Sequence, residues 1–140
     1  MTQPIPTYVH AVGDYLTSLA APYAARRLSV RPRTRRIVDA VAALTTAQSL
    51  MTDYEGGAVP MVPMQTHLTG DVGLGVGLLS AAVFLRNTPL PDRRLLAGLG
   101  AFSVVYALLT NPQRSSHASG DALGEARFTG HGEAYASLEA

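Results

Sequence analysis

The chain has 140 residues, the length of about one domain, and only 15% of them are charged, against roughly 25% in a typical soluble domain. All eleven basic residues are arginines and the net charge is +1, so composition gives no case for nucleic-acid binding. Cysteine is absent, which excludes disulfides, thiolate metal ligands and cysteine nucleophiles.

Four apolar stretches follow one another along the chain, over residues 8–25, 37–51, 68–85 and 95–109. None of them alternates with period two, so we predict four helices and no strands. A membrane-spanning helix needs about 20 residues, with about 17 tolerated. The third stretch reaches this length, and the fourth reaches it once flanking polar residues are included. The first two are weaker candidates that would insert as partners of the others.

We therefore predict an all-α fold, a four-helix transmembrane bundle over residues 1–110. The alternative is a soluble four-helix bundle with a hydrophobic centre. A soluble bundle helix normally keeps a charged outer face, and the third and fourth stretches have none. Residues 111–140 are rich in Gly, Ser, Ala and charge and lack an apolar period, which predicts a flexible polar C-terminal tail.

The connections between the stretches differ in charge. Arginines crowd the first and third connections, whereas the second carries Asp53 and Glu55 and no basic residue. Because basic loops stay in the cytoplasm, we predict a multi-pass protein of the cell membrane with arginine-rich loops inside and both termini outside. The expected partners are the lipid bilayer and other membrane subunits or a second copy of the chain. Nucleic acid is not expected, because the arginine-rich segment lacks interleaved aromatic residues.

The chain contains an internal duplication. Three pairs of segments match in order at an offset of 57 or 58: residues 10–14 with 67–71, 35–36 with 93–94, and 50–53 with 108–111. Each repeat is predicted to be a helical hairpin, over about 8–56 and about 65–110. Two helices return the chain to its starting side, so the repeats are parallel and related by an axis along the membrane normal.

Hairpin repeats of this size, with an early aspartate and a later Ser-Pro-Trp-like break in the first helix, resemble the SPW-repeat integral membrane proteins. The resemblance covers about residues 8–110 and includes the His-x-x-x-Asp spacing and the TDYEGG…VPMQTHL connection. The signature triplet is Ala21-Pro22-Tyr23 in the first repeat, where the proline should kink or end the helix, and Ser80-Ala81-Ala82 in the second. The resemblance implies a membrane architecture and no particular activity.

Two His/Asp pairs are the candidate site: His10 with Asp14, and His67 with Asp71. Residues four apart share one helix face, about 5–6 Å apart at Cβ, and the duplication places the pairs across the central axis. The preferred interpretation is a structural lock in which each aspartate accepts a hydrogen bond from the histidine of its own helix. The alternatives are a divalent metal site or proton relay, since imidazole and carboxylate suit Zn²⁺, and a site for another small ligand. Residues 53–55 are expected to be a solvated loop, with completion of a metal site from above as the alternative.

Two smaller patterns concern helix contacts. Gly73, Gly77 and Ala81 recur every four residues, which predicts a close helix–helix contact at these positions. Asp39 follows Arg35 by four residues, which predicts an ion pair within one helix.

No Gly-x-Ser-x-Gly, P-loop or His-Glu-x-x-His motif occurs in the sequence, so an enzyme is the least favoured class and no catalytic residue or cofactor is predicted. We expect a structural or accessory membrane protein, such as a subunit of a larger assembly. The alternative is a transport protein, or one that handles metal ions or protons through the paired His/Asp motifs.

Overall fold

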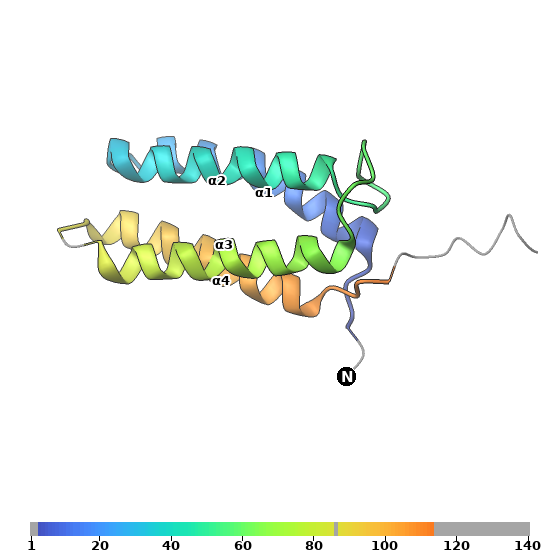
Figure 1. Cartoon of the computed structure of the whole chain (residues 1–140). Coiled ribbons are helices and arrows are strands. Elements are labelled where there is room, and N and C mark those ends of the chain that lie inside the picture. The colour runs from blue at the N-terminus through green and yellow to red at the C-terminus, as the bar shows by residue number, and fades with distance from the viewer. Residues whose placement is uncertain (1–2, 86, 114–140) are drawn as a thin grey trace, which may run out of the picture.

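The computed structural model describes residues 3–85 and 87–113, which form four helices: α1 (Thr7–Arg27), α2 (Pro32–Leu50), α3 (Met64–Phe84) and α4 (Leu90–Leu109). Figure 1 shows two hairpins, α1–α2 and α3–α4, lying as two layers. The α1–α2 and α3–α4 connections lie at one end, and the α2–α3 connection, the start of α1 and the end of α4 at the other. The predicted all-α, four-helix architecture is confirmed, whereas residues 114–140 of the predicted tail lie outside the described part of the chain.

Prolines mark the start of every helix. Pro6, Pro63 and Pro89 are the residues just before α1, α3 and α4, and Pro32 is the first residue of α2. Proline has a fixed φ and no N–H, and the first turn of a helix leaves its N–H groups unpaired in any case. Pro22 lies inside α1, which continues past it to Arg27, so of the two expected outcomes, a kink or an end of the helix, the end is wrong.

Glycines bring α3 and α4 into close contact. A Cβ added to Gly75 would lie 2.7 Å from the carbonyl oxygen of Gly100, and one added to Gly100 would lie 2.6 Å from that of Gly75. Gly73 and Gly77, by contrast, have nothing within 4 Å, so the contact predicted at these positions is wrong. Both glycines are exposed, whereas Ala81, the third residue of the pattern, is partly buried against the hydrophobic core.

The end of the bundle that carries the arginines is packed by a hydrophobic core. Buried side chains from all four helices and the α1–α2 connection meet there, namely Ala21, Ala25, Val30, Val38, Leu78, Ala82 and Leu96. The buried Asp92 joins the two hairpins beside this core. Its Oδ1 accepts hydrogen bonds from the backbone N–H of Arg31 at 3.0 Å and from Thr34 Oγ1 at 2.6 Å.

The ion pair predicted between Asp39 and Arg35 is wrong. The carboxylate of Asp39 instead binds the guanidinium of Arg26 on α1, with N···O distances of 2.9 and 3.1 Å. The neighbouring helix presents both guanidinium nitrogens to both carboxylate oxygens, a geometry that favours Arg26 as the partner.

No charged side chain is exposed over most of the length of the four helices, namely residues 8–25, 40–50, 64–85 and 95–109. Their only acidic residues, Asp14 and Asp71, are buried. A stripe of large apolar side chains, each at least 53% exposed, follows the outer face of α1: Tyr8, Val12, Leu16, Leu19 and Tyr23. Among the described helices, α3 alone is long and apolar enough to cross a membrane by length and composition. In α4 the first turns hold three charged residues, which lowers its apolar character.

Candidate metal centre

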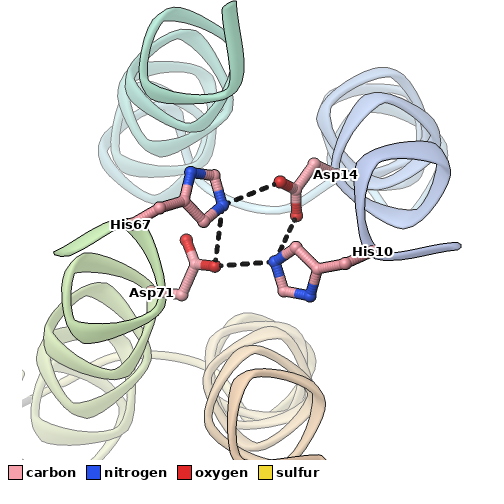
Figure 2. Close-up of side chains that lie close together, drawn as sticks. All are labelled: His10, Asp14, His67 and Asp71. Carbon is pink, nitrogen blue, oxygen red and sulfur yellow. Dashed lines mark hydrogen bonds and ion pairs between the residues drawn. The ribbon is translucent and has the colours of Figure 1, made fainter. Parts of the chain in front are cut away.

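Four titratable side chains meet between the two hairpins: His10 and Asp14 from α1, and His67 and Asp71 from α3 (Figure 2). All four are buried, with exposed fractions between 0 and 6%. His10 Nε2 lies 3.4 Å from Asp14 Oδ1 and 3.0 Å from Asp71 Oδ2. His67 Nε2 lies 3.0 Å from Asp14 Oδ2 and 3.1 Å from Asp71 Oδ2. The residues singled out in the sequence therefore form one cluster, with contacts both within and between the repeats.

The spacing of the candidate ligand atoms suits a single metal ion. One ligand atom from each residue can be chosen so that all four lie within 4.8 Å of one another. Bonds of about 2.0–2.1 Å to a tetrahedral ion place its ligand atoms about 3.3 Å apart. With Asp14 Oδ2 and Asp71 Oδ2 as the carboxylate ligand atoms, three nitrogen–oxygen contacts in the set are 3.0–3.1 Å, close to this value. The two carboxylates also carry the charge that one divalent cation neutralises.

Two threonines determine which nitrogen of each histidine faces the centre. Thr110 Oγ1 lies 2.7 Å from His10 Nδ1, and Thr52 Oγ1 lies 2.7 Å from His67 Nδ1. Each hydroxyl donates its one proton to the backbone carbonyl four residues earlier, in both cases at 2.7 Å. The hydroxyl oxygen must then accept from the ring, which assigns the proton of each neutral ring to Nδ1.

Each Nε2 therefore faces the carboxylates either as a bare lone pair or with a second ring proton. A lone pair about 3 Å from a carboxylate oxygen is repulsive unless a cation lies between them. His10 Nε2 is hydrogen-bonded to Asp71 Oδ2 at 3.0 Å, whereas His67 Nε2, which lies 3.0–3.1 Å from both carboxylates, has no hydrogen-bond partner among the described residues. Histidines that bind metal ions typically donate the other ring N–H to a neighbouring acceptor, as both histidines do here.

Neutral donors hold the two carboxylates in place. Ser49 Oγ donates to Asp14 Oδ2 at 2.8 Å, and the Tyr54 hydroxyl lies 3.5 Å from the same oxygen. Burial raises the pKa of Tyr54 above its ordinary value, so the hydroxyl keeps its proton at neutral pH. Gln48 Nε2 donates to Asp71 Oδ1 at 3.2 Å. These groups orient the carboxylates but bring no positive charge.

The expectation of a solvated loop over residues 53–55 is wrong for its central residue. Tyr54 is only 3% exposed, and its ring centroid lies 5.6 Å from that of His67. Glu55 accepts a hydrogen bond from Thr7 Oγ1 at 2.6 Å, which ties the loop to the start of α1. Neither Asp53 nor Glu55 belongs to the cluster of possible metal ligands among the described residues. The loop therefore covers the cluster without supplying a ligand.

The threonines are the functional residues that sequence reasoning missed, although the repeat alignment contained them. Thr52 and Thr110 occupy equivalent positions in the matching segments 50–53 and 108–111. Each threonine contacts the histidine of the other repeat. The backbone of each threonine also contacts the segment that leads into the other hairpin. Thr110 forms an isolated β-bridge with Ile5, and Thr52 forms one with Val62.

No known protein family, curated protein or solved structure matches the chain. The function of the site is therefore inferred from its own geometry.

Proposed function

We propose that the chain is an integral membrane protein that binds one divalent transition-metal ion, Zn²⁺ first among them, between its two hairpins. The ligands are His10, Asp14, His67 and Asp71. The observation that carries the proposal is the pair of threonine-held rings whose Nε2 atoms face two buried carboxylates. Burying two carboxylates without a counter-charge is costly, and a divalent cation between two neutral imidazoles removes that cost. Imidazole and carboxylate together suit Zn²⁺.

The surface of the helices supports a place in the membrane. Helices of 19–21 residues rising 1.5 Å per residue are about 29–32 Å long, close to the roughly 30 Å of a hydrocarbon core. Their middle sections expose no charge, and the stripe on α1 leaves large apolar side chains without a partner in the bundle. We propose that α3 and α4 span the bilayer with α1 and α2 as their partners.

The charge distribution supports one orientation. Arginines gather around the α1–α2 and α3–α4 connections. The four candidate ligands lie in the first two turns of α1 and α3, and these helices start at the opposite end of the bundle (Figure 1). The positive-inside rule places the arginine end in the cytoplasm and the metal centre toward the outer face. Membership of the SPW-repeat family is part of this proposal, and the duplicated hairpin supports it.

The ion would join the two hairpins, because each hairpin supplies one histidine and one aspartate. This function is structural or accessory and needs no catalysis. In the competing arrangement both rings carry a second proton and the four residues form a salt-bridged lock without metal. Such a lock requires two imidazolium groups in a buried site, and it leaves His67 Nε2 without a hydrogen-bond partner among the described residues.

Metal analysis of the purified protein distinguishes the two arrangements. The full chain, purified in detergent through a tag without histidines, should contain about one divalent ion per chain by inductively coupled plasma mass spectrometry. His67→Ala and Asp14→Asn should lose this ion. His117→Ala and His131→Ala, which lie outside the described residues, are matched controls that should keep it.

A wild-type chain that remains metal-free after equilibration with Zn²⁺ would overturn the proposal and support the lock. A metal ion that binds the folded state alone should also stabilise it, by about 2.7 kcal/mol at a concentration of 100 times Kd. The membrane part is tested separately by fractionation of cells. Recovery of the chain in the soluble fraction, without detergent, would contradict it.

A further inference from the structure

Positive charge is concentrated at the end of the bundle where the α1–α2 and α3–α4 connections lie (Figure 1). All eight arginines that the structure describes are exposed and lie at this end, namely Arg26, Arg27, Arg31, Arg33, Arg35, Arg36, Arg93 and Arg94. Only two acidic residues, Asp39 and Asp92, accompany them among the described residues. The net charge of the whole chain is +1, so the excess belongs to this end and not to the protein as a whole.

Hydrogen bonds between the hairpins join these arginines into one surface. Arg31, just before α2, donates from its backbone N–H to Asp92 of α4 at 3.0 Å. Its guanidinium donates to the backbone oxygen of Asn87, in the α3–α4 connection, at 2.8 Å. The two connections therefore lie against each other, and the arginines of both repeats face the same surroundings.

The starts of α2 and α4 meet on the axis that relates the two repeats. Thr34 and Asp92 occupy equivalent positions at the offset of 58, and Thr34 Oγ1 donates to Asp92 Oδ1 at 2.6 Å. A contact between two equivalent residues lies on that axis. The arginine pairs at residues 35–36 and 93–94 follow directly, one pair on each side. These four residues are called the axial arginines below.

Neither aspartate neutralises the axial arginines. Asp39 binds Arg26, and Asp92 accepts from a backbone N–H and a hydroxyl. Arg93 Nε donates to the neutral carbonyl of Ala82 at 2.9 Å, and no acceptor among the described residues contacts the guanidinium groups of the other three. The helix dipoles of α2 and α4 are also positive at this end. An anion from outside the chain would relieve the repulsion between these like charges.

Large apolar side chains are exposed next to the axial arginines. Arg93 contacts Ala82 at the end of α3, and the next two residues, Val83 and Phe84, are 64% and 77% exposed. Leu90, the first residue of α4, is 56% exposed. A phospholipid presents an anionic head group directly beside its acyl chains, and this surface offers a partner to both. A nucleic acid or an acidic peptide would leave the apolar side chains without a partner.

We propose that the axial arginines bind the phosphodiester of an anionic phospholipid such as phosphatidylglycerol, with an acyl chain against Val83 and Phe84. A guanidinium can donate two parallel hydrogen bonds to a phosphate, which makes arginine well suited to this group. A zwitterionic head group carries its own positive charge and should bind more weakly. This inference rests on the proposed place in the membrane and is independent of the metal centre.

The test uses the full chain in detergent and native mass spectrometry, which separates chains with and without bound lipid. Dimyristoyl phosphatidylglycerol and dimyristoyl phosphatidylcholine are compared, because they differ in the head group alone. The anionic lipid should bind about tenfold more tightly or better, as expected for arginines close to an anionic group, and should lose affinity as salt is raised. Equal Kd values for the two lipids would overturn the inference.

Variants assign the binding to the axial arginines. Arg35→Gln with Arg36→Gln, and separately Arg93→Gln with Arg94→Gln, should each weaken binding of the anionic lipid by about 10- to 30-fold. Binding of the zwitterionic lipid should not change. The melting temperature without lipid shows whether each variant is folded, and the two double variants test the same claim independently.

The matched control removes the same charge from the same end. Arg26 binds Asp39, and Arg27 donates to the Tyr23 hydroxyl at 2.8 Å, so both already have partners within the chain. Arg26→Gln with Arg27→Gln should therefore leave the affinity for the anionic lipid nearly unchanged. Equal losses in all three double variants would mean a general attraction by net charge, and the assigned site would be refuted.

Competitors distinguish a lipid from other anions. Inorganic phosphate and a short single-stranded RNA, each at constant ionic strength, should not displace the anionic lipid. Displacement by phosphate would assign the site to a soluble phosphate compound, and tighter binding of the RNA would assign it to nucleic acid; either result contradicts the inference. Recovery of the chain in the soluble fraction of cells would overturn the place in the membrane itself. A membrane-bound chain that does not distinguish the two lipids overturns this inference alone.

Discussion

Replacing Thr52 by valine tests whether the threonines prepare the histidines for metal binding. The two side chains have nearly the same shape, so the change mainly removes the hydroxyl that lies 2.7 Å from His67 Nδ1. The ring then loses the acceptor that fixes its proton and its orientation. Loss of such an outer partner typically lowers metal affinity 10- to 100-fold, or about 1.4–2.8 kcal/mol at about 1.4 kcal/mol per tenfold.

The assay is a competition titration of Zn²⁺ against a chelator in detergent, which gives Kd for each variant. Thr110→Val should weaken binding to a similar extent, because Thr110 holds His10 in the equivalent way. Thr46→Val is the matched control, since the Thr46 hydroxyl donates to a carbonyl four residues earlier at 2.9 Å and contacts no histidine. If Thr52→Val and Thr46→Val gave the same Kd, the argument from the threonines would be refuted.

Three further predictions concern orientation and packing. A cysteine at Ser29 should resist an impermeant thiol reagent on intact cells while one at Ala58 is labelled, and the reverse pattern would contradict the proposed orientation. Gly75→Ala should lower the free energy of unfolding by about 1–3 kcal/mol, because the added methyl overpacks the α3–α4 contact. Gly77→Ala places its methyl in open space and should be neutral or stabilise the protein by up to about 1 kcal/mol. Equal melting temperatures of the two variants would show that the assigned helix face is wrong. Asp92→Ala leaves the buried Thr34 hydroxyl and the partly buried N–H of Arg31 without their acceptor and should cost about 1–3 kcal/mol in a denaturant titration, so an unchanged midpoint would argue against its role in joining the hairpins.

The convergence of the four site residues could be predicted from the sequence because it follows from symmetry. Two His-x-x-x-Asp motifs at equivalent positions of parallel repeats must face the same axis if they turn inward. The threonines lay in the same alignment, but a threonine near a helix end is ordinarily explained by its bond to the backbone. Its second contact, with a histidine of the other hairpin, depends on how the hairpins pack.

Predictions made from the spacing of residues in one helix were wrong where the contact depends on a residue of another helix. The spacing of Gly73 and Gly77 shows that they share a face, but not toward which side the face turns. Asp39 had a suitable partner one turn away, yet Arg26 on the adjacent helix offers a better geometry. Tyr54 lies in a segment of polar composition, and its burial depends on the loop folding back over the histidines.

The exchange of contacts between the hairpins has a consequence for assembly. One hairpin carries one histidine, one aspartate and the threonine that serves the opposite histidine, so it encodes half of a centre and cannot complete it alone. Two separate hairpins could build the same centre only by meeting in the bilayer. Joining them through the α2–α3 connection makes that meeting intramolecular, with an effective concentration on the order of millimolar. Joining them also frees the two halves to differ, as Ser18 of the first and Gly75 at the equivalent position of the second do.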